Sequence, residues 1–75
     1  MIIKCVFPDH IIQDPIIQQL GYEFDVITSI RQAKITSDVG WVVLDMLGEE
    51  LEIQKSIVWL AEKGIGIQIV KEEIV

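Results

Sequence analysis

The sequence contains few of the residues with which small proteins reinforce a fold through covalent links or metal ions. Among its 75 residues there are one cysteine, Cys5, and one histidine, His10. One cysteine cannot form a disulfide within the chain, and an iron–sulfur cluster requires several cysteines. We therefore expect a fold held together by packing alone, with Cys5 as an ordinary buried side chain. A reducing, cytoplasmic compartment fits this composition best.

Long hydrophobic runs and basic side chains are also scarce. The apolar run from Trp41 to Leu44 stops at Asp45, and no run approaches the roughly 20 residues that cross a bilayer. The first residues, MIIKC, lack the basic region and long apolar stretch of a signal peptide. Six Lys and Arg face 12 Asp and Glu, giving a net charge of −6 without a basic stripe. We expect neither membrane insertion nor nucleic-acid binding.

Residue patterns typical of catalysis are missing as well. No serine or cysteine motif accompanies His10, and the five glycines do not form a phosphate-binding loop. Asp9, His10 and Asp14 are close enough in sequence to be considered as metal ligands, but Asp14 is better explained as a helix cap. The sequence therefore predicts no enzyme, no bound metal and no cofactor.

Apolar side chains are abundant. They make up 51% of the residues, and the mean hydropathy is +0.44. A chain of this length is expected to form one domain over residues 1–75 and to bury only about 60% of its unfolded surface. Either the core is unusually dense, or apolar surface remains for a partner. The second alternative predicts self-association, most simply as a homodimer.

Four segments have the composition of β-strands. Residues 2–7, 26–35 and 40–47, and the chain from residue 65 onward, are rich in β-branched and apolar residues. In residues 40–47 both alternating faces are largely apolar, although an exposed sheet face usually alternates with polar residues. This predicts a sheet with one face against the core and one apolar face left for an interface.

Two segments between these strands are predicted to be helical. Asp14 and Pro15 suit a helix start, and Gly21 is expected to allow close packing of that helix on the sheet. Gly48 precedes acidic residues that favour the start of a second helix, and Gly64 suits its left-handed end. The apolar stripes that we expect to be buried are Ile16, Ile17 and Leu20 in the first helix and Ile53, Ile57, Leu60 and Ala61 in the second.

The resulting order, β-α-β-β-α-β, predicts a ferredoxin-like α+β fold. Right-handed crossovers place both helices on one face of a four-stranded antiparallel sheet. The opposite face stays open and is the predicted interface. Trp41 is the expected anchor of that interface, since tryptophan is frequent among binding hot spots. The residues assigned to the interface are Trp41, Val43, Leu47 and Val70.

The order and spacing of these segments resemble an NIL domain, an ACT-like module. The resemblance includes Phe7 at the end of the first strand, Pro15 to Ile17 at the start of the first helix, and the strand from Gly40 to Gly48. It also includes Ser56 to Leu60, ahead of a final strand that follows a glycine. NIL domains occur at the C-terminus of methionine-importer ATPases, beside iron–sulfur ferredoxin domains and as free-standing proteins. The resemblance implies a regulatory or adaptor role.

The Asn-Ile-Leu motif of that family falls on Ser29, Ile30 and Arg31. In the transporter-linked members the asparagine lies near a methionine ligand, and its amide offers a donor and an acceptor in one plane. Ser29 is shorter and cannot reproduce this geometry. The resemblance therefore does not carry methionine binding over to this chain.

Arg31 and Ser29 nevertheless suggest a ligand site. The guanidinium of Arg31 suits a carboxylate or phosphate, and ACT-like domains often close a site with the first βα connection, which here contains Asp9 and His10. The simpler interpretation, without a ligand, is that Arg31 is a solvated strand residue or forms a surface ion pair.

Two functions remain open. One is a non-enzymatic regulatory module that self-associates through its sheet and senses a small amino-acid-like ligand between subunits. The alternative is a protein-interaction domain that assembles with itself or with another protein and binds no small molecule.

Overall fold

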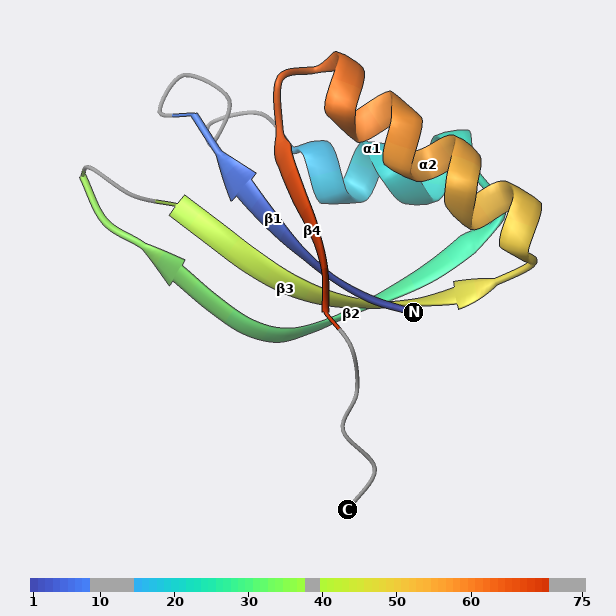
Figure 1. Ribbon diagram of the computed structural model, residues 1–75, viewed down its shortest axis with the longest axis horizontal. Coiled ribbons are helices and arrows are strands. Elements are labelled where there is room, and N and C mark those ends of the chain that lie inside the picture. Colours follow the sequence, from blue (N-terminus) through green and yellow to red (C-terminus); the bar gives the residue numbers. More distant parts are fainter. Residues whose placement is uncertain (9–14, 38–39, 71–75) are drawn as a thin grey trace.

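The computed structural model describes residues 1–8, 15–37 and 40–70, and all six predicted elements lie in these ranges (Figure 1). Asp9, His10, Asp14 and the tail after Val70 are outside the described residues. No helix in the described ranges has the length and apolar character needed to cross a membrane. The elements are β1 (Ile2–Phe7), α1 (Ile16–Glu23), β2 (Val26–Ile35), β3 (Gly40–Gly48), α2 (Glu50–Glu62) and β4 (Gly66–Val70).

The four strands form one sheet in the order β2-β3-β1-β4, and every neighbouring pair is antiparallel. Both helices pack on the same face of this sheet, and no element of the described residues covers the other face (Figure 1). The predicted ferredoxin-like α+β arrangement is thereby confirmed.

The core lies between the helices and the sheet. Its strand residues alternate along β1 and β3, so that every second side chain points toward the helices. Cys5 has no exposed surface, as predicted for an ordinary packed cysteine. The core residues are Ile3, Cys5, Ile16, Leu20, Val26, Val42, Leu44, Met46, Ile53, Leu60 and Ile65.

The end of α2 follows the glycine signal in the sequence. Gly64 has a φ of 87°, a left-handed conformation that costs glycine nothing. Its N–H donates to the carbonyl of Ala61 at 3.0 Å, and the Ile65 N–H donates to the carbonyl of Leu60 at 3.3 Å. This pair of bonds is a Schellman motif, and the contact between buried Ile65 and Leu60 seals it.

Three details of the helices differ from expectation. Ala61, which was predicted to be buried, is exposed. Ser56 is buried instead, and its hydroxyl donates to the carbonyl of Ile53 at 2.7 Å. A small hydroxyl satisfied by its own helix can be buried at little cost. Gly21 does not pack on the sheet, because a Cβ there would have nothing within 4 Å. Pro15 occupies the N-cap of α1 rather than its first turn, and its carbonyl accepts the N–H of Gln19.

A β-bulge interrupts β2 at its centre. Ile30 pairs with Leu44, but Gln32 pairs with Val43, so Arg31 is an extra residue in the ladder. An extra residue inverts the alternation of everything that follows it. Ile35, which would otherwise share a face with Ile27, therefore lies on the side of the helices.

Candidate functional site

The face of the sheet opposite the helices, which we call the uncovered face, contains all four predicted interface residues. Cross-strand partners point to the same side of a sheet, so the pairing assigns each residue to a face. Leu47 is 57% exposed and its partner Ile27 is 67% exposed, whereas Trp41 and Val43 are half-buried. The uncovered face consists of Ile2, Lys4, Val6, Ile27, Ser29, Arg31, Gln32, Lys34, Trp41, Val43, Asp45, Leu47, Gln68 and Val70.

Ser29 and Arg31 meet on this face at Asp45. Ser29 is the cross-strand partner of Asp45, and Nη2 of Arg31 donates to Oδ2 of Asp45 at 3.0 Å. Arg31 therefore forms a partly exposed ion pair in this structure, as the simpler of the two interpretations predicts. Since the Asp45 carboxylate offsets the charge of Arg31, any anion bound here competes with it.

Trp41 is held on the same face by a cation. The ammonium nitrogen of Lys4 lies 4.7 Å from the centre of the Trp41 ring, within the range of a cation–π interaction. Lys34 is the cross-strand partner of Trp41 on the other side. The indole is thus flanked by two lysines and keeps part of its surface open.

The first βα connection begins at the opposite end of the sheet from Ser29. Phe7, just before this connection, pairs with Gly40, whereas the row that contains Ser29 and Asp45 reaches Ile2. The five-residue step from Ile2 to Phe7 corresponds to about 17 Å along a strand. Within one chain, the start of the connection is therefore not beside Ser29. The predicted positions Asp9 and His10 are outside the described residues.

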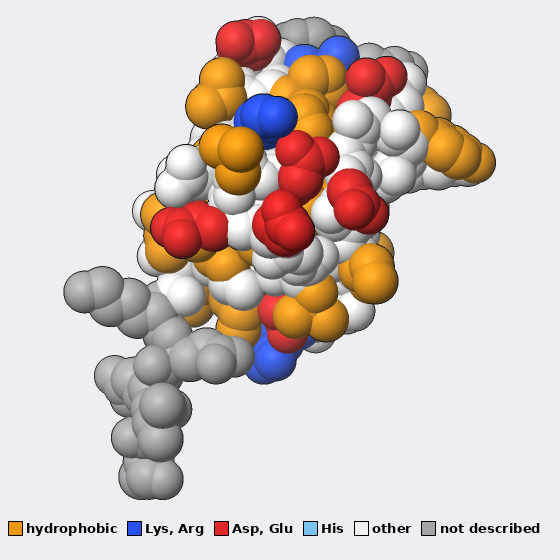
Figure 2. Space-filling view, turned by 90° about the vertical axis from the view of Figure 1, so that its right-hand side faces the viewer, with side chains coloured by type: hydrophobic (Ala, Val, Ile, Leu, Met, Phe, Trp, Pro, Cys, Tyr) orange, Lys and Arg blue, Asp and Glu red, His pale blue; other side chains and the backbone are white. Residues whose placement is uncertain are grey.

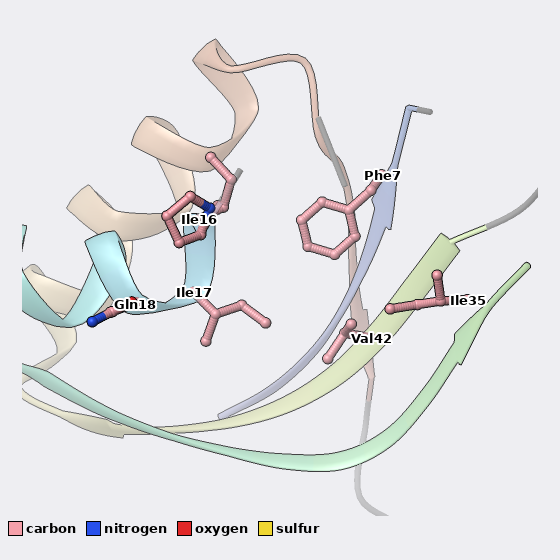
Figure 3. A pocket seen from close by; sticks show the side chains of 7 residues that line it. Phe7, Ile16, Ile17, Gln18, Ile35 and Val42 are labelled. Carbon is pink, nitrogen blue, oxygen red and sulfur yellow. The ribbon is translucent and has the colours of Figure 1, made fainter. Parts of the chain in front are cut away.

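A pocket of about 160 Å³ opens under the start of α1. Figure 3 shows Phe7 from β1, Ile17 from α1 and Val42 from β3 turned toward one another, with Ile35 of β2 on the far side of the pocket from α1. Gln18 is the one polar side chain among the described residues that line it, which also include Pro15 and Ile16. Engineered apolar cavities of about 150 Å³ hold a benzene molecule, so this pocket accommodates a small apolar group.

The sequence did not indicate this pocket as a candidate site. Strand alternation places Phe7 and Val42 on the helix side with Cys5 and Leu44, so these two could have been found. Ile35 could not, because it reaches the pocket only through the bulge at Arg31.

Titratable groups in the described residues give no sign of catalysis or metal binding. No three of their Cys, His, Asp and Glu side chains lie close enough to hold a metal ion. Burial raises the pKa of the Cys5 thiol to about 11. The thiol is therefore neutral at physiological pH and is a poor nucleophile or metal ligand.

Comparisons with known proteins agree with this architecture. A solved structure, the C-terminal domain of an ABC transporter / ATP-binding protein from Enterococcus faecalis, is similar with a TM-score of 0.83 and 28% sequence identity. The alignment covers 96% of this chain and 84% of that one. A comparison with curated proteins gave no match. The NIL domain family model matches residues 1–69, and the chain therefore belongs to the NIL domain family.

Proposed function

We propose that this NIL domain is a non-catalytic regulatory module that self-associates through the uncovered face of its sheet. The observation that carries the proposal is a set of exposed apolar side chains on a sheet face that no described element covers. Ile27, Leu47, Val6 and Val70 are between 39% and 67% exposed there. Large exposed apolar patches usually mark interaction sites. The similar domain from Enterococcus faecalis belongs to a transporter ATP-binding protein, which supports a regulatory role.

The face is a better candidate for self-association than the β2 edge of the sheet. The edge strand β2 has a bulge at Arg31 and a lysine at position 34, and both features discourage pairing with another strand. Face-to-face packing uses side chains instead, with two sheets about 10 Å apart. We therefore expect Trp41, Val43 and Leu47 to be buried between two copies.

The test is the mass of the protein in solution. Replacing two apolar side chains of the face, Ile27→Ser and Leu47→Ser together, should turn the dimer into a monomer in sedimentation equilibrium. The matched control is Leu51→Ser with Val58→Ser on α2, because those side chains are 60% and 56% exposed, against 67% and 57% for the first pair. A control pair that dissociates the protein equally, or an unmodified protein that is a monomer at every concentration, would contradict the proposal.

A second candidate function, sensing of a small amino-acid-like ligand, is favoured by the pocket under α1. Its apolar lining and the amide of Gln18 suit a ligand with an apolar side chain and one polar group. A bound ligand regulates assembly only if it binds the assembled and free states with different affinity.

A panel of amino acids tests this second candidate through thermal stability. A ligand present at about 100 times its Kd should stabilise the folded state by about 2.7 kcal/mol. Ile35→Phe fills the pocket and should abolish that shift. Ile30→Phe is the matched control, since Ile30 lies on the same strand, is 59% exposed against 61% for Ile35, and does not line the pocket. If no amino acid shifts the stability, the chain is the ligand-free assembly domain.

A further inference from the structure

A shallow groove runs along the outer side of α2, on the other surface of the molecule from the uncovered face. It has a volume of about 440 Å³. Two of its apolar side chains are widely open to solvent, with Leu51 60% and Val58 56% exposed. We call this feature the α2 groove, and its lining residues are Phe24, Leu51, Gln54, Lys55, Val58, Trp59 and Glu62.

The groove follows a second side of the helix, on which two apolar side chains, Leu51 and Val58, are exposed. The first stripe, Ile53, Ser56 and Leu60, is buried against the sheet. Leu51 and Val58 are seven residues apart, which places them one above the other two turns along a different side of α2. Gln54 and Lys55 lie between them at the spacing of a helix–helix seam. A surface helix needs one apolar stripe to join its own core, so the exposed Leu51 and Val58 are available to a partner.

The wall of the groove is preformed. The rings of Phe24 and Trp59 meet edge to face with centroids 5.8 Å apart, and Nζ of Lys63 lies 4.6 Å above the Trp59 ring. The N–H of Asp25 donates to Oε1 of Glu52 at 3.2 Å and ties the chain after Phe24 to α2. This hydrogen bond, with a second from Lys55, holds the pKa of Glu52 below its ordinary value.

The groove is lined by one acidic side chain, Glu62, and one basic one, Lys55, and Glu50 and Glu52 border it through contacts with Gln54 and Lys55. Residues 15–25 and 49–64, which form the described part of the helical layer, have six acidic and two basic side chains, which are Glu23, Asp25, Glu49, Glu50, Glu52, Glu62, Lys55 and Lys63. Both lysines are engaged, Lys55 with Glu52 at 3.4 Å and Lys63 with the Trp59 ring. Figure 2, which views the molecule from the right-hand side of Figure 1, shows acidic side chains gathered between hydrophobic ones. An apolar groove with an acidic border is complementary to a partner that is apolar on one side and basic beside it.

We propose that the α2 groove binds a positively charged amphipathic helix of a partner protein. The distance from Leu51 to Glu62 along α2 is about 16 Å, so three turns of a partner helix match its length. A second copy of this chain fits poorly, because Lys55 is the one basic residue within its helices α1 and α2.

Binding of model peptides to the intact chain tests the proposal. The probe is a fluorescent helical peptide of about 14 residues, made of Leu at i, i+3, i+4 and i+7 with Lys elsewhere. Two control peptides are a scrambled sequence of the same composition and a peptide with Glu in place of Lys. We expect the Leu-Lys helix to bind at least about tenfold more tightly than either control in fluorescence anisotropy.

Variants of the chain then locate the binding site. Leu51→Ser with Val58→Ser should weaken binding of the Leu-Lys helix by at least about tenfold, whereas Ile27→Ser with Leu47→Ser should leave it unchanged. Glu50→Gln with Glu62→Gln should weaken it and reduce its dependence on salt. The proposal is overturned if the scrambled peptide binds equally, if the Leu-Lys helix does not bind, or if the first pair of variants has no effect. The mass of these variants without peptide reports separately on self-association.

Discussion

Cys5 is a single residue whose surroundings make the stability of the whole chain depend on pH. Its thiol is fully buried in the first strand, and burial raises its pKa from 9.0 to about 11. The neutral thiol fits the core, whereas the thiolate would have to be buried without a partner charge. The folded state therefore binds this proton more tightly than the unfolded chain does.

The sign of the effect follows from linkage. A raised pKa contributes stability that is fully present below pH 9.0 and is lost as the pH rises toward 11. We expect the free energy of unfolding in urea to fall by about 2–3 kcal/mol over this window, at 1.36 kcal/mol for each pH unit. Cys5→Ala is the control, because it keeps every other titrating group. A fall of the same size in Cys5→Ala would assign the effect to other residues.

Substitution by alanine is expected to change the free energy of unfolding in opposite directions at Gly48 and Gly21. A Cβ at Gly48 would lie 2.9 Å from the backbone oxygen of Asp25, and its φ of 157° is rare for other residues. A Cβ at Gly21 would meet nothing within 4 Å, in the middle of α1. Gly48→Ala should therefore lower the free energy of unfolding by about 1–3 kcal/mol. Gly21→Ala should raise it by about 0.5–1 kcal/mol. Thermal and urea unfolding measure both, and equal effects would contradict the contacts described.

At the scale of elements, the order and direction of the strands follow from sequence patterns, but the register of β2 does not. Gly64 ends α2 as its position predicts, and the alternation in β3 correctly separates core residues such as Leu44 from Val43. No glycine or proline in the sequence indicates the bulge, and Arg31 has the character of an ordinary exposed strand residue. The pocket could therefore not be predicted in full, since Ile35 reaches it only because of that bulge. The burial of Ser56 was not predicted either, because a pattern of apolar residues does not include a serine.

The bulge predicts that removing Arg31 and replacing it have different consequences. Arg31→Ala keeps the extra residue and breaks the partly exposed ion pair with Asp45, which should cost less than about 1 kcal/mol. Deleting Arg31 restores simple alternation, which turns Lys34 toward the helices and Ile35 away from them. We expect a clearly larger loss, of about 1–3 kcal/mol from the displaced polar group. Urea unfolding of both variants tests this, and equal costs would show that the bulge is not needed.

At the scale of the whole molecule, charge is divided between two surfaces. Among the residues that the structure describes, the uncovered face has three basic side chains and one acidic one, whereas the helical layer has two basic and six acidic ones. Two uncovered faces brought together repel each other at low salt, while a basic helix in the α2 groove is attracted. The two proposed interactions should therefore respond to salt in opposite directions.

Raising the salt concentration from about 0.01 M to about 1 M shortens the Debye length from about 30 Å to about 3 Å. Over this range self-association should strengthen in sedimentation equilibrium, and binding of the Leu-Lys helix should weaken. Lys34→Gln is expected to reduce the salt dependence of self-association and to leave that of peptide binding unchanged, because Lys34 belongs to the uncovered face. Weakening of both interactions by salt would contradict this division of charge.

The placement of the two tryptophans gives each surface its own optical signal. Trp41 lies under Lys4 on the uncovered face, and Trp59 lies under Lys63 in the wall of the α2 groove. Since the chain contains no other tryptophan, Trp41→Phe leaves an emission that reports on the groove alone, and Trp59→Phe leaves one that reports on the sheet. One spectrometer can therefore follow assembly and partner docking separately, in the same protein and without an added label.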